Sequence, residues 1–209
     1  MIINIVAGGP LDIDLVKAHP ADLTIGVDYG AYQLINNNMT LDVAFGDFDS
    51  INTYQLVELL NTCSKVNKYK KDKDNTDTEL AFSYALELKP DVIQLFGVTG
   101  KRIDHFLSVL YLFKKVLSCN VKLIIIDEYN KIYIKKPGVH HIKKSEYHYL
   151  SFFAYQDEVV NLTLTNFKYK LDNYLLKNQD SLCISNELIS DVGIVSFDKG
   201  ILLIVESRD

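Results

Sequence analysis

The feature that most constrains the fold is a change in hydrophobic period near residue 130. Before it, short apolar runs alternate with stretches whose apolar residues recur at helical spacing. Strands are expected over 2–7, 23–27, 43–45, 65–67, 92–96 and 121–126, and helices over 11–19, 31–38, 54–61, 77–88 and 103–117. In the last helix Phe106, Leu110, Phe113 and Leu117 share one face. This alternation predicts an α/β fold, a mostly parallel sheet with helices on both faces.

After residue 130 the helical signals disappear and strands follow one another with short turns. These strands are expected over 132–135, 147–154, 159–164, 182–185, 192–197 and 201–205. Alternating polar and apolar residues in 159–165 fit a half-buried antiparallel strand. We therefore expect two domains, an α/β domain over 1–130 and an antiparallel β-sandwich or barrel over 131–209. The second is small enough to need support from the first domain or another subunit.

The charge balance excludes some classes of function. A net charge of -5 and a pI near 5.5 give no broad basic surface, which argues against a nucleic-acid partner held through phosphates. The apolar runs are too short for a membrane span, and no targeting segment is visible. The three cysteines, Cys63, Cys119 and Cys183, form no zinc or disulfide pattern. A soluble, cytoplasmic protein is expected.

The segment Ala44 to Ser50, AFGDFDS, is the first candidate site. Asp47 and Asp49 follow a buried strand, and alternate residues of an extended chain point the same way, so both carboxylates can meet one cation. Mg²⁺ prefers such oxygen ligands and is usually coordinated by substrate phosphates as well. Asp and Ser after a strand are also ordinary turn and cap residues, so this pair alone leaves both interpretations open.

A second acidic cluster precedes a helix. Asp72, Asp74 and Asp77 lie within one short run, DKDNTDTE, where the crowding of charge favours a cation. Part of the run has a structural explanation, because Thr76 followed by Glu79 is a capping box. Asp77 in the first turn also suits the helix dipole.

Glycines at strand ends supply further candidates. Gly8-Gly9 fits either a phosphate approach or a tight turn, and Asp28 stands between glycines at the next strand end. The segment GVTGKRIDH, residues 97–105, is not a P-loop, because its glycines are too close together and Arg102 replaces the required Ser or Thr. It instead places cations at a helix N-terminus, where Arg102 suits a phosphate. His105 alone is more typical of a packed helix residue.

In this order and spacing, GVDYGA, GDFDS, DKDNTDTELA and GVTGKRIDHF resemble the motif series of the thiamine pyrophosphokinase family. The later KPG, LTNFKYKL and SNE resemble its β domain. The resemblance implies a first domain that binds ATP and Mg²⁺, a β-sandwich second domain, and a homodimer that forms the thiamine sites between its subunits. The implied reaction transfers a diphosphoryl group from ATP to thiamine, giving thiamine diphosphate and AMP.

The resemblance also implies roles for individual residues. Asp47, Asp49 and Asp77 correspond to metal-binding acids that act in catalysis together with Arg102. The residues expected around the nucleotide are Asp28, Asp72, Lys73, Asp74, Thr76, Gly100, Arg102, Asp104 and His105. Ser185 and Asn186 fall in the segment that contacts thiamine. The chain departs from the family at Tyr29, Lys101, Val109 and Asn166, and none of these departures removes a carboxylate.

Two other classes of function remain as alternatives. A haloacid-dehalogenase-like phosphatase also places Asp-x-Asp at a strand end, with the first Asp as nucleophile, but usually after the first strand of its core. Here two strands and two glycine loops precede the motif. A nucleotide-sensing protein without turnover would hold Mg-ATP with the same acids.

Overall fold

The computed structural model describes residues 1–68 and 75–209 and divides the chain into two compact units, Met1–Glu128 and Tyr129–Asp209. The expected boundary lay two residues later, after residue 130. Among the described residues, no helix has the length and apolarity that crossing a bilayer requires. Each unit is described by itself below.

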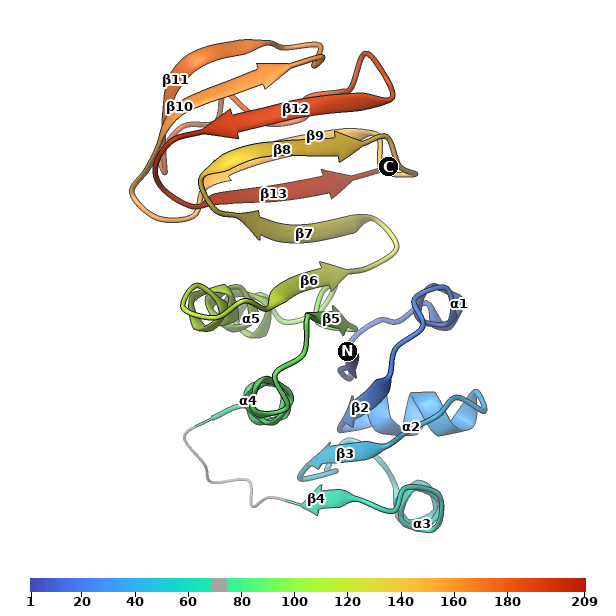
Figure 1. Cartoon of the computed structure of the whole chain (residues 1–209). Coiled ribbons are helices and arrows are strands. Elements are labelled where there is room, and N and C mark those ends of the chain that lie inside the picture. The colour runs from blue at the N-terminus through green and yellow to red at the C-terminus, as the bar shows by residue number, and fades with distance from the viewer. Residues whose placement is uncertain (69–74) are drawn as a thin grey trace. The chain divides into compact units, whose positions relative to one another are not determined.

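Parallel strands form the sheet of the first unit, in the order β4-β3-β2-β1-β5-β6 (Figure 1). The strands are β1 Ile2–Val6, β2 Leu23–Val27, β3 Val43–Gly46, β4 Val66–Lys68, β5 Val92–Phe96 and β6 Lys122–Ile126. The chain steps outward from β1 to β4 and then returns to the other side of β1 with β5. The loops after β1 and β5 therefore diverge at a topological switch point, where open α/β sheets bind ligands.

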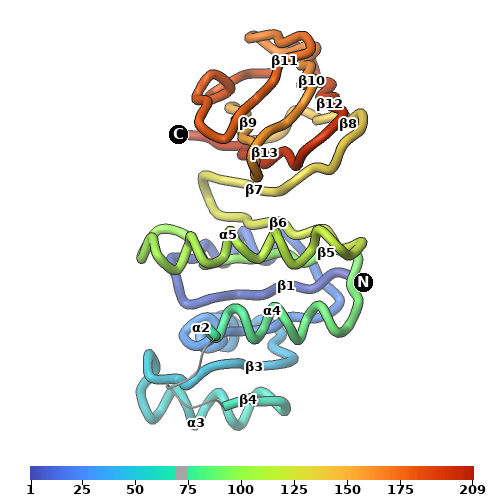
Figure 2. The backbone as a smooth tube through the Cα atoms, turned by 90° about the vertical axis from the view of Figure 1, so that its left-hand side faces the viewer, coloured from blue at the N-terminus to red at the C-terminus, as the bar shows by residue number. Residues whose placement is uncertain are grey.

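Helices cover both faces of this sheet (Figures 1 and 2). The helices are α1 Ile13–Lys17, α2 Tyr29–Asn36, α3 Thr53–Thr62, α4 Asp77–Glu87 and α5 Ile103–Val116. α4 and α5 pack against each other on one face, whereas α2 and α3 share the opposite face with α1. Buried Leu34, Leu59 and Phe96 belong to the core cluster beneath these three helices.

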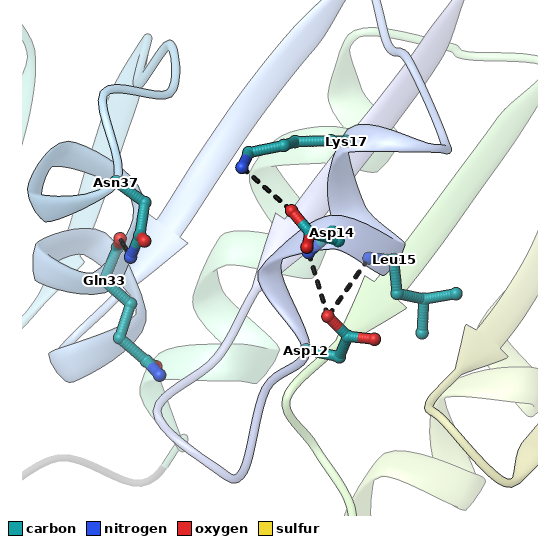
Figure 3. Close-up of polar contacts among 6 residues, drawn as sticks. All are labelled: Asp12, Asp14, Leu15, Lys17, Gln33 and Asn37. Carbon is teal, nitrogen blue, oxygen red and sulfur yellow. Dashed lines mark hydrogen bonds and ion pairs between the residues drawn. The ribbon is translucent and has the colours of Figure 1, made fainter.

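Local hydrogen bonds fix the start of α1 and the end of α2 (Figure 3). Asp12 Oδ1 accepts the N–H groups of Asp14 at 2.9 Å and Leu15 at 3.4 Å, and Asp14 pairs with Lys17. The N-cap at Asp12 starts α1 at Ile13, and the helix ends at Lys17 with Ala18 as its C-cap, so it is shorter than the expected 11–19. At the end of α2, Asn37 Nδ2 donates to the Gln33 carbonyl at 2.8 Å, which satisfies a terminal backbone acceptor.

The other helix starts agree more closely with the sequence. Thr76 caps α4 by accepting the Glu79 N–H at 3.2 Å, which is one half of the predicted capping box, whereas the Glu79 carboxylate accepts from Lys115 Nζ at 2.7 Å. Asn52 and Gln55 form a reciprocal capping box on α3, which the sequence did not predict.

The predicted apolar face of α5 is partly wrong. Only Phe113 of the four expected residues is buried, with Val109, Leu112 and Val116, because the helix packs on both β6 and α4.

The second unit contains two antiparallel layers. Strand β13, Leu202–Ser207, pairs with β7, Asn130–Lys135, and with β9, Tyr149–Ala154. The other layer has the order β11-β10-β12-β8 and consists of β11 Leu171–Lys177, β10 Glu158–Thr165, β12 Val192–Phe197 and β8 Gly138–Lys143. Phe152 and Ile204 from the first layer share one core with Leu162 and Val195 from the second. The predicted fold class is confirmed.

Three strand predictions in this unit are wrong. Strands β8 and β11 were not expected, since each has few buried apolar residues, Ile142 in β8 and Leu176 in β11. The expected strand over 182–185 is absent. Ser185 has φ 56° and the segment forms turns, held by isolated bridges from Asn186 to Leu150 and from Leu188 to Phe167.

Candidate active site

A pocket of about 240 Å³ opens at the carboxyl ends of β1, β2 and β5, within the first unit. Its position is the switch point of the sheet. The pocket is lined by Ala7, Gly8, Gly9, Val27, Asp28, Tyr29, Ser50, Thr76, Thr78, Gly97, Val98, Thr99, Lys101, Arg102, His105, Ser108 and Val109. It therefore brings together Asp28, Thr76, Arg102 and His105 from the sequence-predicted set.

Two glycine loops meet backbone to backbone at this pocket. The Gly9 N–H donates to the Gly97 carbonyl at 2.8 Å, and a Cβ at Gly9 would lie only 2.3 Å from that oxygen. Gly97 itself has φ 65°, a conformation that disfavours side chains. The contact thus requires glycine at both positions, and it leaves this part of the pocket lined by main chain.

Asp28 ties the end of β2 to the loop after β3. Its backbone N–H donates to the Phe45 carbonyl at 2.9 Å, and its Oδ1 accepts the Phe48 N–H at 3.3 Å. Asp28 precedes α2 with φ 48°, and its side chain does not cap the helix. A Cβ at Gly46 would lie 2.0 Å from Asp28 Oδ1, so glycine is needed there. Such constrained backbone is typical of functional sites.

The loop with Asp47 and Asp49 lies beside the pocket, which its neighbour Ser50 lines. The segment is not extended as expected, because buried Phe48 has φ 60° and Asp47 Oδ1 accepts the Asp49 N–H at 3.0 Å. Asp47 is half-buried and Asp49 is exposed. Among residues 1–68 and 75–209, no group of three His, Cys, Asp or Glu side chains is arranged to hold a metal ion.

Arg102 and Asp104 form a bidentate ion pair at the start of α5. Arg102 Nε and Nη2 donate to the two Asp104 oxygens at 3.1 and 2.6 Å, and Asp104 Oδ1 also accepts the His105 N–H at 2.9 Å. This hydrogen bonding raises the pKa of Arg102 and lowers that of Asp104. Asp104 does not line the pocket itself, but both residues that it bonds, Arg102 and His105, do.

Lys101 and Thr99 complete the loop after β5. Lys101 Nζ donates to the Gly8 carbonyl at 3.2 Å, so it reaches the loop after β1. Thr99 Oγ1 donates to Asp127 Oδ2 at 2.6 Å, directly after β6. The pocket is also lined by four hydroxyl residues that the sequence did not predict, Thr99, Ser50, Thr78 and Ser108. For Thr99 a signal was Asp127, an acid directly after a strand that its hydroxyl bonds.

The remaining predicted residues are placed as follows. Asp77 does not line the pocket but stands between Thr76 and Thr78, which do. Gly100 turns the chain with φ 80° next to Lys101. Asp72, Lys73 and Asp74 lie outside the described residues.

In the second unit, Asn186 is buried and its amide bonds internally. Its Oδ1 accepts the N–H groups of Tyr169 and Glu187 at 3.0 and 2.9 Å, and its Nδ2 donates to the Tyr169 carbonyl at 2.8 Å. Ser185 is exposed, and its N–H donates to Ser151 Oγ at 3.0 Å. Asn186 thus holds the turn on which Ser185 is presented.

Comparison with known proteins agrees with this geometry. Residues 17–125 match the family model described as "Thiamin pyrophosphokinase, catalytic domain", and residues 139–202 match "Thiamin pyrophosphokinase, vitamin B1 binding domain". A curated thiamine pyrophosphokinase from Bacillus subtilis is 43% identical over 211 residues, covering 99% of both chains.

Solved structures give the same result. A crystal structure of thiamine pyrophosphokinase from Bacillus subtilis has a TM-score of 0.93 and 42% identity, with 100% of both chains covered. One from Geobacillus thermodenitrificans has a TM-score of 0.89 and 37% identity, with 100% of this chain and 98% of the other covered. The matches extend over both units, and this chain belongs to the thiamine pyrophosphokinase family.

Proposed function

We propose that this chain is a thiamine diphosphokinase that converts ATP and thiamine to AMP and thiamine diphosphate. The observation that carries the proposal is the pocket at the switch point, where glycine loops, Asp28 and Arg102 meet in a chain of this family. A main-chain surface with nearby cations suits a polyphosphate, because backbone can approach closely and fixed positive charge offsets the phosphate oxygens. The cytoplasmic location stays a prediction from the sequence.

ATP is placed with its phosphates against the loops after β1 and β5. Asp104 accepts from Nε and Nη2 of Arg102, and we propose that the other edge of the planar guanidinium, with Nη1, binds phosphate oxygens. Lys101 supplies a second cation from the same loop. Among the described residues, the further nucleotide contacts that we propose are Thr76, Gly100 and His105. Asp72, Lys73 and Asp74 are proposed as nucleotide contacts from the sequence alone.

The donor set near the pocket suits Mg²⁺ in one respect, since Asp47 and Asp49 offer carboxylate oxygens on one short loop. Among the described residues no three such side chains are already gathered, so this assignment requires the Asp47–Asp49 loop and Asp77 to meet around an ion that also binds water and substrate phosphates. We propose that Asp47, Asp49 and Asp77 hold it. When bound, Mg²⁺ would neutralise charge on the migrating phosphates.

The reaction is an in-line displacement at the β-phosphorus. The thiamine hydroxyl oxygen forms a bond to this phosphorus and releases its proton to the solvent, and the bond from this phosphorus to the oxygen bridging the α- and β-phosphorus breaks, so AMP departs. Positioning and electrostatic stabilisation carry most phosphoryl transfers. We therefore assign this chain no covalent nucleophile, and Arg102 acts by stabilising charge.

Thiamine is assigned to the second unit, with Ser185 as the contact and Asn186 as the residue that fixes its turn. The family-model match over residues 139–202 supports this assignment. A homodimer is part of the proposal, and its test is described in the Discussion.

Product analysis tests the proposed function. The purified chain is incubated with ATP, Mg²⁺ and thiamine, and the thiamine compounds are separated by chromatography. We expect thiamine diphosphate to accumulate in equal amount with AMP. Release of inorganic phosphate without any thiamine ester would instead favour the Asp-x-Asp phosphatase, and ATP binding without product would favour a nucleotide sensor.

A further inference from the structure

The hydroxyl-to-carboxylate bond between Thr99 and Asp127 lies at the pocket but has no part in the chemistry described above. Thr99 Oγ1 donates to Asp127 Oδ2 at 2.6 Å, and both residues are partly buried. Thr99 lines the pocket, and Asp127 directly follows β6, whose last residue Ile126 is 2% exposed. The bond thus connects a loop of the pocket to a strand in the core.

The loop that contains Thr99 has glycines on both sides, so a side-chain bond to the core can restrict its backbone. Gly97 and Gly100 flank it with φ 65° and 80°, and glycines restrict the backbone least. The Thr99 carbonyl oxygen would lie 3.1 Å from a Cβ at Gly9, so the backbone of Thr99 already packs closely on the loop after β1. A rotation of this turn would therefore disturb both glycine loops.

Two cationic side chains of the pocket follow Thr99 within three residues along the chain. Lys101 and Arg102 both line the pocket, and Arg102 leads into α5. Their positions relative to the sheet depend on the turn that carries them. We propose that Asp127 is a positioning residue that, through Thr99, sets where Lys101 and Arg102 meet the ATP phosphates. This rests on the proposed function for the identity of the ligand.

The charge of Asp127 supports a positioning role. Asp127 does not line the pocket, and a carboxylate repels phosphate oxygens where no cation lies between them, so we assign it no direct contact with the ligand. It is a strong acceptor for a hydroxyl, and charge-assisted hydrogen bonds are shorter and stronger than neutral ones. The 2.6 Å distance fits that class.

The test compares four variants by calorimetric titration with ATP in Mg²⁺ buffer. Thr99→Val removes the hydroxyl at equal size, and Thr99→Ser keeps it. Asp127→Ala removes the acceptor, and Asp127→Asn keeps an acceptor oxygen without the charge. We expect Thr99→Val and Asp127→Ala each to weaken ATP binding about tenfold, because a bond to a charged group is lost. Thr99→Ser should stay within about threefold of the unmodified chain. Asp127→Asn should lie between about threefold and tenfold weaker, because its amide oxygen accepts the same bond without charge assistance.

Two further readouts separate positioning from general stability. The double variant T99V/D127A should lose no more ATP affinity than either single variant, since each single variant already breaks the same Thr99–Asp127 bond. Ser145→Ala is the matched control, because Ser145 Oγ donates to Glu206 Oε2 at 2.9 Å in the second unit. It should lower the melting temperature without changing ATP affinity. In turnover, Thr99→Val should raise the KM for ATP and leave the KM for thiamine unchanged.

Several outcomes would overturn the inference. Thr99→Val with unchanged ATP affinity would do so, as would losses that add in the double variant. If Asp127→Asn binds ATP as weakly as Asp127→Ala, accepting the Thr99 hydrogen bond is not what Asp127 contributes. A chain that binds ATP but makes no thiamine diphosphate would refute the proposed function and leave this test intact, whereas one that binds no ATP would refute both.

Discussion

The backbone at Phe48 decides where the two acids beside it stand. Phe48 is buried, and its φ of 60° turns the chain between Asp47 and Asp49. Burial of a large aromatic side chain offsets the cost of this conformation, which is about 1–2 kcal/mol for a residue other than glycine. As a result Asp47 and Asp49 lie in a turn directly after β3, and Asp49 is exposed beside the pocket.

At this scale we predict that Asp49→Asn leaves the protein folded but lowers kcat about a hundredfold or more. Asn keeps the shape of the side chain and removes one charge from the proposed metal site, and losing one such stabilising group typically costs this much. The measurement is steady-state turnover at saturating ATP, thiamine and Mg²⁺.

The control for this change is Asp14→Asn, which alters an exposed acid of α1 that pairs with Lys17. It should retain full activity and a similar melting temperature. If Asp49→Asn stays within a few-fold of the unmodified chain, the metal assignment is wrong.

At the scale of elements, the sequence predicted the features that depend on local patterns. The start of α4 after Thr76 followed from its capping residue, and the parallel strands followed from continuous apolar runs. β8 and β11 were missed because their burial depends on neighbours in the sheet rather than on their own periodicity. The site was predicted where glycines and acids end strands, whereas Thr99 and Ser50 reach the pocket only through the tertiary fold.

In the segment 182–190, hydrogen bonds from one side chain satisfy backbone groups that would otherwise pair in a strand. One buried amide, Asn186, bonds to both backbone groups of Tyr169 and to the N–H of Glu187. The sequence suggested a strand from the apolar residues there, but Leu182 and Ile184 are exposed. Side-chain hydrogen bonds of this kind offer the backbone an alternative to the sheet.

We therefore predict that Asn186→Ala destabilises the protein by about 3 kcal/mol, because buried backbone groups lose their partner. The measurement is urea denaturation followed by circular dichroism. Asn178→Ala, at an exposed position in the same unit, is the control and should change the free energy of unfolding by less than about 0.5 kcal/mol. Equal stabilities of the two variants would contradict the structural role of Asn186.

At the scale of the whole molecule, each unit exposes apolar side chains. On α5, Ile103, Leu107 and Tyr111 are spaced at helical intervals and are exposed, and in the second unit Leu182 and Ile189 are exposed as well. Exposed apolar groups that cluster on one surface are typical of interfaces. They support the proposed homodimer, as does the small size of the second unit, Tyr129–Asp209.

We predict that light scattering gives about twice the chain mass of 23.8 kDa. Leu107→Lys should shift the protein toward the monomer, because it places a charge in the apolar stripe of α5. Val57→Lys, at an exposed apolar position of α3 on the other face of the sheet from α5, is the matched control and should stay dimeric. A strict monomer that still turns over thiamine would contradict the dimeric site.

The central claim is attack at the β-phosphorus of ATP, and isotopic labelling tests it most directly. The chain is incubated with thiamine, Mg²⁺ and ATP labelled at the α-phosphorus, and all labelled products are separated by chromatography. The proposed reaction predicts that the label leaves in AMP and that the thiamine diphosphate is unlabelled. Label in ADP, matched by an equal amount of thiamine monophosphate, would show attack at the γ-phosphorus and would contradict the account.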